Sequence, residues 1–364
     1  MNIRSVVNAI EDFAPRALQE SYDNSGLQAG DATNICTGVL LTLDVTELTI
    51  SEAKEYGFNF VVSHHPLLFK SVKSITPDSA VGRILRSAIK NDISIYSAHT
   101  SLDNARYGVS YQMARNLNLV DIQTLQPQAD RLEKIVVFVP NSYAETVKSA
   151  IAKAGAGYIG DYDACTYSMQ GVGSFRAKEG AEPFVGDIGS IHNEPETRIE
   201  AIMPKYLQGR VVDSMRAVHP YEEPAYDIIP LFNEDRYSGS GAVGYTKFPV
   251  KASDFLESVK SEFKCQGIRY SGDLNKMITK VALCGGSGAF LANVASATGA
   301  DIYITGDLKY HDFTSFEGDM ILVDIGHYES EQCAKDILQR VISNEFPKLP
   351  IRQSIYDINT INYM

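Results

Sequence analysis

The chain has 364 residues, of which 44% are hydrophobic and 21% charged, a composition that excludes a disordered, collagen-like or coiled-coil chain. Its 33 Lys and Arg residues stand against 45 Asp and Glu residues, and the net charge of −12 argues against nucleic acids and anionic membranes as partners, because binding to either needs clustered cations. A chain of this length predicts about two domains.

Residues 1–126 alternate strand and helix patterns. Apolar residues recur at helical spacing from Ile3 to Phe13, and Pro15 ends that helix. Apolar runs and amphipathic stretches then alternate, with strands expected at 38–43, 58–62 and 92–98 and helices at 45–56, 80–90 and 109–117. This alternation predicts an α/β layer built on a largely parallel sheet.

Residues 127–233 follow a different pattern, which begins after a polar segment that carries Pro127. The expected order is strand–helix–strand–strand–helix–strand, over 134–140, 143–153, 165–175, 198–204, 205–217 and 224–231. That order is typical of a ferredoxin-like α+β fold. We therefore expect an inserted domain, which ends at the polar, Gly-rich segment 232–244.

Residues 234–364 return to the α/β pattern and repeat the first region. Segment 37–65 aligns without a gap on 279–307, and segment 93–103 aligns on 321–331. The fold class that follows is α/β: two similar halves, 1–126 and 234–364, form one metal-binding core, and the ferredoxin-like domain is inserted between them.

The repeat also pairs residues that can hold metals. In this alignment His65 falls on Asp307, His99 on His327, and Asp103 on Glu331. Functional groups of α/β sheets collect beyond the carboxyl ends of the strands. Ligand-type residues follow the predicted strands at eight positions: His64, His65, His99, Asp103, Asp307, His311, His327 and Glu331.

Mixed imidazole and carboxylate sites suit Zn, Fe, Mn or Co, and this many ligands favours two ions bridged by a carboxylate. Adjacent His64 and His65 before Pro66 are the strongest candidates, since two imidazoles at the end of an apolar strand seldom serve packing. His327 and Glu331 could instead form an ordinary pair one helical turn apart. Their alignment with His99 and Asp103 favours ligation.

Other residues have two interpretations each. Asp307 and His311 could support the site, or lie on a surface turn; His99, His311 and Asp307 are candidates for proton transfer. Asp44 could cap a helix or support the site. The glycines of 284–289 could cradle a phosphate or make a tight turn. In segment 217–227 a strand-edge turn is favoured over a site.

Several sequence blocks resemble the Nif-three-like dinuclear metal proteins, whose members are often named GTP cyclohydrolase 1 type 2 homologues. The resemblance covers nearly the whole chain outside the insert, and HHP with a late GHxxxE is quite specific to that family. One departure is Ala242, where the family often has Arg. The blocks are YDNSGLQAG (22–30), LTLDVT (41–46), VVSHHPLLF (61–69), SAHTSLDNA (97–105), VALCGGSG (281–288), DIYITGDLKYHD (301–312) and GHYESE (326–331).

The resemblance implies a cytoplasmic, ring-shaped homohexamer with two divalent transition-metal ions (Zn, Fe or Mn) in each subunit. The matching ligand positions are His64, His65, Asp103, His327 and Glu331, with Glu331 as the bridge. The insert resembles the CutA and PII-like modules of longer members. A cytoplasmic location also fits the scattered cysteines and the lack of a signal peptide or an apolar stretch of about 18 residues.

Two functions follow from these residues. The first is a metal-dependent hydrolase that acts on a small molecule, a nucleotide or a related compound, in the manner of a type 2 GTP cyclohydrolase. The second is a non-catalytic metal-binding ring scaffold that binds partner proteins or a small effector. An open coordination position would distinguish the first from the second.

Overall fold

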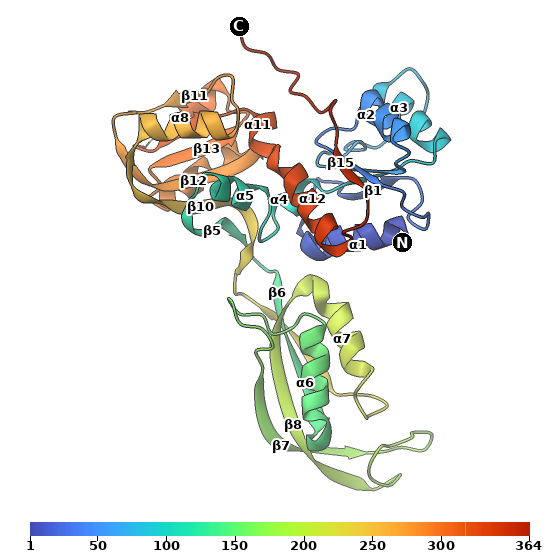
Figure 1. Ribbon diagram of the computed structural model, residues 1–364. Helices are drawn as coiled ribbons and strands as arrows, with labels where there is room; N and C mark the ends of the chain where they lie inside the picture. The colour runs from blue at the N-terminus through green and yellow to red at the C-terminus, as the bar shows by residue number, and fades with distance from the viewer. Residues whose placement is uncertain (317) are drawn as a thin grey trace. The chain divides into compact units, whose positions relative to one another are not determined.

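A computed structural model describes residues 1–316 and 318–364, which form two compact units (Figure 1). Unit 1 consists of residues 1–127 and 236–364, and unit 2 of residues 128–235. Among the described residues no helix is long and apolar enough to cross a membrane. The five cysteines are all free thiols.

The first half of unit 1 carries a five-stranded sheet in the order β1-β4-β3-β2-β15. Strands β2, β3, β4 and β15 run parallel, and β1 is antiparallel to β4. The elements of this half are α1 (Ile3–Phe13), β1 (Gly26–Ala29), β2 (Val39–Thr42), α2 (Glu47–Glu55), β3 (Phe60–Ser63), α3 (Ala80–Lys90), β4 (Ser94–Ser97), α4 (His99–Asp103), α5 (Val109–Asn116) and β15 (Ile351–Gln353).

The second half carries a six-stranded sheet in the order β11-β14-β13-β12-β10-β5. Strands β12, β13 and β14 run parallel, and antiparallel strands flank them. Its elements are β5 (Val120–Gln128), β10 (Asp235–Lys251), α8 (Ala252–Glu262), β11 (Arg269–Ser271), β12 (Met277–Ser287), α9 (Ala292–Ala297), β13 (Ile302–Gly306), α10 (Tyr310–Thr314), β14 (Ile321–Asp324), α11 (His327–Glu331) and α12 (Cys333–Glu345).

The two halves therefore repeat one arrangement of strands, as the alignment predicts. Three parallel strands stand in the order β4-β3-β2 and β14-β13-β12, and an antiparallel strand lies beside β4 and beside β14. The central strands β2, β3, β4 and β14 are buried along their whole length, because helices or loops cover both faces of a parallel sheet.

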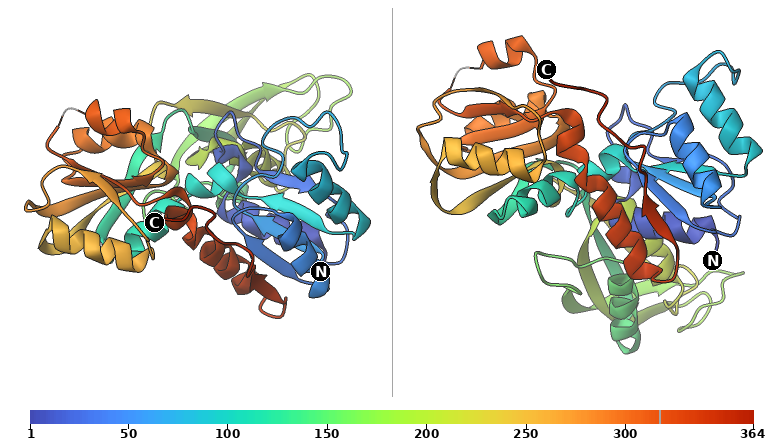
Figure 2. Two further views of the ribbon diagram at one scale, coloured as in Figure 1. Left: turned by 90° about the horizontal axis from the view of Figure 1, so that it is seen from above. Right: turned by 45° about the horizontal axis from the view of Figure 1, so that its top comes forward.

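A single apolar cluster joins the halves. It includes Val7 of α1, Val62 of β3, Met113 of α5, Leu283 of β12 and Leu338 of α12. Helix α12 runs between the two sheets (Figure 2). Truncating one of these fully buried side chains to Ala costs about 2–5 kcal/mol, so the halves behave as one core rather than as two independent domains.

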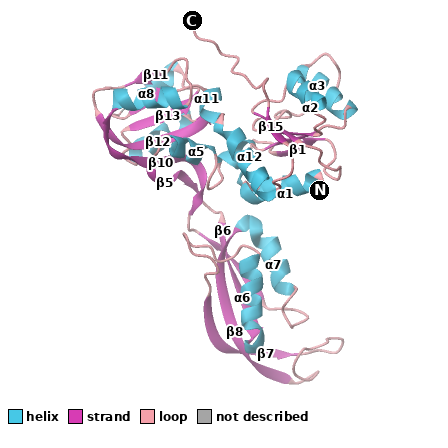
Figure 3. Cartoon of the chain, in the orientation of Figure 1, coloured by secondary structure: helices cyan, strands magenta, loops and turns pink. Residues whose placement is uncertain are grey.

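Unit 2 confirms the ferredoxin-like prediction. Its antiparallel sheet has the order β7-β8-β6-β9, and both helices pack on one face (Figure 3). Side chains such as Ile135, Val147, Ile199 and Val211 form the core between sheet and helices. The elements are β6 (Leu132–Pro140), α6 (Ala144–Lys153), β7 (Tyr167–Arg176), β8 (Ile191–Pro204), α7 (Gln208–Arg216) and β9 (Tyr226–Leu231).

Five strands of unit 1 are not predicted by the sequence: the short strands β1, β11 and β15, and the longer strands β5 and β10. Strand β5 includes most of the polar segment before the insert, and β10 includes the Gly-rich segment after it. Polar residues are tolerated in β5 because it is the last strand of its sheet. In β10, Gly239 and Gly241 adopt positive φ angles of 148° and 71°, which suit a bent strand.

Candidate metal centre

The five candidate ligands gather in unit 1, beyond the carboxyl ends of the parallel strands. His64 and His65 directly follow β3, and Asp103 ends α4, the short helix after β4. His327 and Glu331 begin and end α11, the corresponding helix after β14. Backbone hydrogen bonds fix the first loop: the His64 N–H donates to Thr42 O, and the His99 N–H donates to His64 O.

Glu331 lies at the centre of the cluster, and its side chain is only 5% exposed. Its Oε2 is 2.8 Å from Nε2 of His65 and 2.9 Å from Nε2 of His327. Its Oε1 is 3.6 Å from Nε2 of His64, which is also 3.6 Å from Oδ1 of Asp103. The two carboxylate oxygens thus face two different groups of ligands.

Three polar atoms of this cluster have no hydrogen-bond partner among the described residues. They are both ring nitrogens of His64 and Oδ1 of Asp103, and all three are buried. Leaving such groups unpaired is costly, and a cation between imidazole and carboxylate would satisfy them. Ligand atoms of His64, His65 and Glu331 lie within 4.8 Å of one another, so these three residues could hold a metal ion.

The electrostatics of the metal-free site fit this interpretation. Burial alone would lower the pKa of His65, but hydrogen bonds to Asp44 and Glu331 outweigh it and raise the pKa to about 10. Burial would also lower the pKa of His327, but hydrogen bonds to Asp307 and Glu331 outweigh this effect and raise the pKa to about 10. Two imidazolium rings, whose Nε2 atoms are 3.3 Å apart, therefore compensate the charge of Glu331 as metal ions would.

The two carboxyl groups respond in opposite ways. Burial would raise the pKa of Glu331, but the charge of His64 and hydrogen bonds from the surrounding histidines hold it well below its usual range. Burial raises the pKa of Asp103 to about 7, although His64 acts in the other direction. A cation near Asp103 would restore its charged form.

Three further carboxylates orient histidine rings through Nδ1. Asp44 is 3.0 Å from Nδ1 of His65, and Asp307 is 2.7 Å from Nδ1 of His327. These bonds leave each Nε2 pointing at Glu331, which is the usual arrangement behind metal-binding histidines. Asp44 does not cap α2, because Thr46 does so in a capping box with Thr49.

Asp23 is the third of these carboxylates, and sequence reasoning assigned it no role. Its Oδ1 is 2.6 Å from Nδ1 of His99, and its Oδ2 accepts bonds from the backbone and hydroxyl of Thr100. Burial raises the pKa of Asp23, but these bonds hold it well below its usual value. The sequence feature that could have indicated a role for Asp23 is its position in the block YDNSGLQAG (22–30), which resembles the metal-protein family.

The candidates for proton transfer separate into two groups. The ring of His99 lies 5.7 Å from the rings of both His64 and His65, so it faces the cluster. His99 and Asp307 have positive φ angles of 36° and 57°, an uncommon conformation that often marks functional sites. His311 is exposed and packs on Tyr310. Among the described residues no hydrogen bond or ion pair joins His311 to the cluster.

The glycine-rich segment 284–289, which begins inside the last part of β12, allows a close approach to Glu331. A Cβ atom on Gly286, whose φ is +62°, would come within 2.1 Å of Oε1 of Glu331. The N–H of Gly286 donates to Oγ of Ser330, on the same helix as Glu331. Of the two interpretations of these glycines, this geometry favours a turn that makes room for the carboxylate.

The C-terminal segment fastens α11. Nζ of Lys335 lies 2.5 Å from a carboxylate oxygen of Asp357, with side chains 9% and 3% exposed. The Tyr328 hydroxyl donates to Asp357 O, and Asn359 donates to Glu329. This segment thus fixes the helix that carries His327 and Glu331, a role with no recognisable sequence pattern.

Comparisons with known proteins agree with this architecture. A sequence profile of the family described as Duf34/NIF3 (NGG1p interacting factor 3) matches residues 1–361. A Bacillus subtilis protein named GTP cyclohydrolase 1 type 2 homolog is 37% identical over 347 residues, which are 94% of this chain and 92% of that protein. A Halalkalibacterium halodurans protein of the same name is 37% identical over 362 residues, 99% of this chain and 96% of that one.

Solved structures give the same result. The Bacillus cereus protein related to NIF3 is similar with a TM-score of 0.88 at 37% identity, covering 100% of this chain and 99% of that one. The Staphylococcus aureus protein SA1388 has a TM-score of 0.77 at 28% identity, with the same coverage. The similarity thus includes the segment of unit 2 as well as both halves of unit 1.

Proposed function

This chain belongs to the Duf34/NIF3 family, and on that basis we propose that it is a metal-dependent hydrolase with two divalent transition-metal ions, Zn, Fe or Mn. The proposed ligands are His64, His65, Asp103, His327 and Glu331, with Glu331 as the bridge. The substrate would be a nucleotide or a related small molecule, in keeping with the name GTP cyclohydrolase 1 type 2 homolog that relatives carry.

The observation that carries this proposal is a pair of buried groups beside Glu331 that have no hydrogen-bond partner among the described residues. They are His64, whose Nε2 is 3.6 Å from Oε1 of Glu331, and Asp103, whose Oδ1 is 3.6 Å from the same Nε2. His65 and His327 face Oε2. A bridging carboxylate with imidazoles on both of its oxygens is the donor set that two-metal hydrolytic sites use.

The chain's own residues would position the reaction. Bound divalent ions would supply Lewis acidity, which polarises a carbonyl or phosphoryl oxygen and makes water a better nucleophile. Asp44 and Asp307 hold His65 and His327 in place through Nδ1. Asp23 occupies Nδ1 of His99, so Nε2 of His99 can take a proton from, or return it to, a bound substrate.

Metal analysis and a substrate screen test the proposal together. The purified chain should contain about two metal ions per subunit and hydrolyse at least one nucleotide or simple phosphoester. Activity should disappear with a chelator and return with Zn, Fe or Mn; Glu331→Ala should be inactive, and exposed Glu179→Gln should match the unmodified chain. Turnover that resists the chelator would contradict a metal mechanism, whereas bound metal without turnover would favour the scaffold alternative.

We also propose that the chain assembles as a homohexamer. Large apolar side chains of the C-terminal segment are exposed, among them Ile355, Ile358, Ile361 and Met364. A second copy could cover these side chains. Light scattering should then give a mass six times the chain mass of 40.0 kDa, and a monomer at micromolar concentration would contradict this assembly.

A further inference from the structure

A buried carboxylate stands at the carboxyl end of β14, next to the two loops that bring Asp307 and His327 together. Asp324 is 4% exposed, and both of its oxygens accept hydrogen bonds from backbone N–H groups. Oδ1 accepts from Gly326 at 2.9 Å, and Oδ2 accepts from Leu308 at 3.0 Å. The first donor directly precedes His327, and the second directly follows Asp307. One carboxylate therefore holds the chain beside each member of that pair.

An arginine of the edge strand β11 completes this arrangement. The guanidinium of Arg269 donates to the carboxylate of Asp324 and, at 2.7 Å, to the carbonyl oxygen of Leu308. Both backbone polar groups of Leu308, which is 2% exposed, are therefore bound by one ion pair. Charged partners form stronger hydrogen bonds than neutral ones, so this ion pair fixes the chain more firmly than an ordinary turn would be fixed.

The chain that the ion pair fixes has an uncommon conformation. Asp307 adopts a φ of +57°, in the left-handed region that is unfavourable for residues with a Cβ atom. Such a conformation persists where the surroundings enforce it, and the bonds to the next residue, Leu308, supply that constraint. In this conformation Oδ2 of Asp307 lies 2.7 Å from Nδ1 of His327.

The first half of unit 1 fixes its corresponding loop in a different way. Tyr96 stands at the position that aligns with Asp324. The hydroxyls of Ser63 and Ser97 donate to the carbonyl oxygen of His65 at 2.7 and 3.1 Å. Among the described residues, no hydrogen bond links the ion pair of Asp324 to this loop. The influence of the ion pair should therefore be confined to one side of the metal centre.

We infer that Asp324 is a positioning residue of the metal centre, an inference that rests on the two-metal site proposed above. It acts through Asp307: by fixing the backbone there, it keeps Oδ2 on Nδ1 of His327, and it thereby keeps Nε2 directed at Glu331. Asp324 itself forms no hydrogen bond or ion pair with a proposed ligand among the described residues. Its loss should weaken binding of the ion that depends on His327 and spare the ion on the other side of Glu331.

Calorimetric titration of the metal-free full chain with zinc tests this inference. The unmodified chain should bind about two ions. The amide of Asp324→Asn retains one acceptor oxygen but loses the charge that pairs with Arg269. In this variant one of the two zinc affinities should fall about tenfold, and the other should stay unchanged.

Asp301 provides a matched control at the amino end of β13, in the same sheet. Its Oδ2 accepts from the N–H groups of Thr279 and Lys280 at 2.8 and 3.0 Å, and its Oδ1 lies 3.3 Å from Nζ of Lys276. Asp301→Asn therefore removes the same kinds of bond far from the ligands, and it should leave both zinc affinities unchanged. Urea unfolding compares the stability that the two variants lose.

A double variant separates positioning from a general loss of stability. In Asp307→Ala the group through which Asp324 acts is absent, so adding Asp324→Asn should weaken zinc binding much less than it does in the unmodified chain. The same loss in both backgrounds, equal weakening of both ions, unchanged affinities in Asp324→Asn, or a similar loss in Asp301→Asn would each overturn the inference. Failure of the unmodified chain to bind zinc would overturn the proposed metal centre, and the inference with it.

Discussion

Helices α4 and α11 hold equivalent places in the two halves of unit 1, but their contacts differ. Each follows the third parallel strand, begins with His and ends with a carboxylate. Asp103 of α4 approaches one imidazole, whereas Glu331 of α11 approaches three. The repeat has preserved the positions of the residues, and the surrounding side chains have made the roles unequal.

The inequality originates in the loops after β3 and β13. The first half provides two adjacent imidazoles, His64 and His65. In the second half Asp307 stands at the position aligned with His65, and it binds Nδ1 of His327 instead of facing Glu331. A repeated framework can thus yield an asymmetric centre, in which one carboxylate contacts three imidazoles and its counterpart contacts one.

The largest expected difference is in metal content. Glu331→Ala should lose both ions, because both depend on its carboxylate, whereas Asp103→Ala should retain about one of two ions. Elemental analysis of the two variants beside the unmodified chain measures this difference. Equal losses in the two variants would show that α4 and α11 have equal roles.

The second difference concerns the C-terminal segment that fastens α11. Asp357→Ala leaves the buried ammonium of Lys335 without its partner, which costs about 3–5 kcal/mol. Urea unfolding should show this loss, and zinc affinity should fall with it. The double variant Lys335→Met/Asp357→Leu removes both charges and should recover most of the stability. No recovery would mean that the ion pair itself stabilises the segment, and that the loss in Asp357→Ala is not only the cost of an unpaired buried charge.

The carboxylates behind the histidines provide a finer comparison. Asp307→Ala should weaken metal binding about 10–100-fold, because His327 loses the group that orients it. Asp23→Ala should leave metal affinity unchanged, because it orients His99, which is not among the proposed ligands. Competition with a chelating dye measures both affinities. A loss in Asp23→Ala as large as that in Asp307→Ala would assign His99 to the metals.

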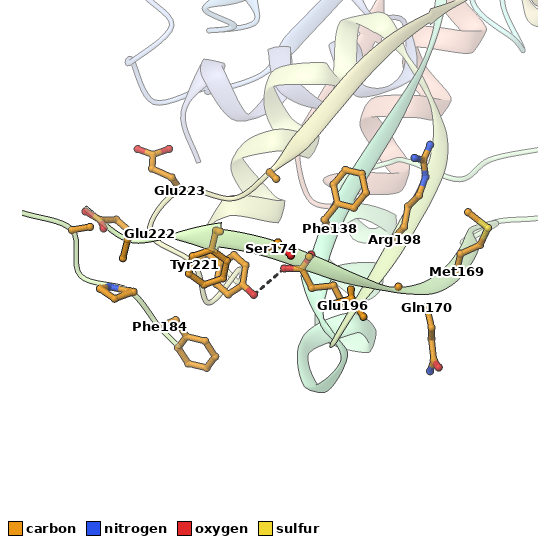
Figure 4. A pocket seen from close by; sticks show the side chains of 18 residues that line it. Phe138, Met169, Gln170, Ser174, Phe184, Glu196, Arg198, Tyr221, Glu222 and Glu223 are labelled. Atoms are coloured by element: carbon orange, nitrogen blue, oxygen red, sulfur yellow. Dashed lines mark hydrogen bonds between the residues drawn. The ribbon is translucent and has the colours of Figure 1, made fainter. Parts of the chain in front are cut away.

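His219 of unit 2 contrasts with His65 and His327, whose carboxylate partners raise their pKa values. Nε2–H of His219 donates to Phe138 O at 3.0 Å, and Nδ1 accepts from the N–H of Tyr221 at 3.1 Å. This ring orders the turn that carries Tyr221 (Figure 4), which agrees with the interpretation of 217–227 as a turn.

Burial lowers the pKa of His219 from its usual value, so the unfolded chain binds this proton more readily than the folded chain. Its contribution to stability is therefore present above pH ~6.5 and is lost as the pH falls below that value. Urea unfolding at pH 7.5 and 5.5 should show a smaller loss in His219→Gln than in the unmodified chain. An equal loss would exclude His219 as the cause.

The smallest expected effect is that of removing unit 2. Replacing residues 129–234 by a short Gly/Ser linker should leave the metal content unchanged, since every proposed ligand lies in unit 1. The hydroxyl of Thr124 donates to Arg236 O at 3.1 Å, so the two ends to be joined are already neighbours. Circular dichroism and elemental analysis of this variant test whether unit 1 folds independently.

The sequence by itself determined the repeat, the ferredoxin-like order of the insert and the positions of the candidate ligands. Period and spacing carry this information, because buried parallel strands require continuous apolar runs and His64 and His65 stand directly at the end of one. Strands β1, β5, β10, β11 and β15 escaped prediction. Four of them are edge strands, where polar residues are tolerated and the apolar run is short or absent, and the glycines of β10 resemble a loop in composition.

Only the tertiary structure decided which carboxylates serve which histidines. Asp23 and His99 are 76 positions apart in the chain, and His65 and Glu331 are 266 apart. No local pattern connects such residues; packing of the two halves brings them together. The same holds for His311, whose spacing resembled that of a ligand but whose side chain is exposed on α10. Local sequence sets the elements, and long-range packing selects the partners.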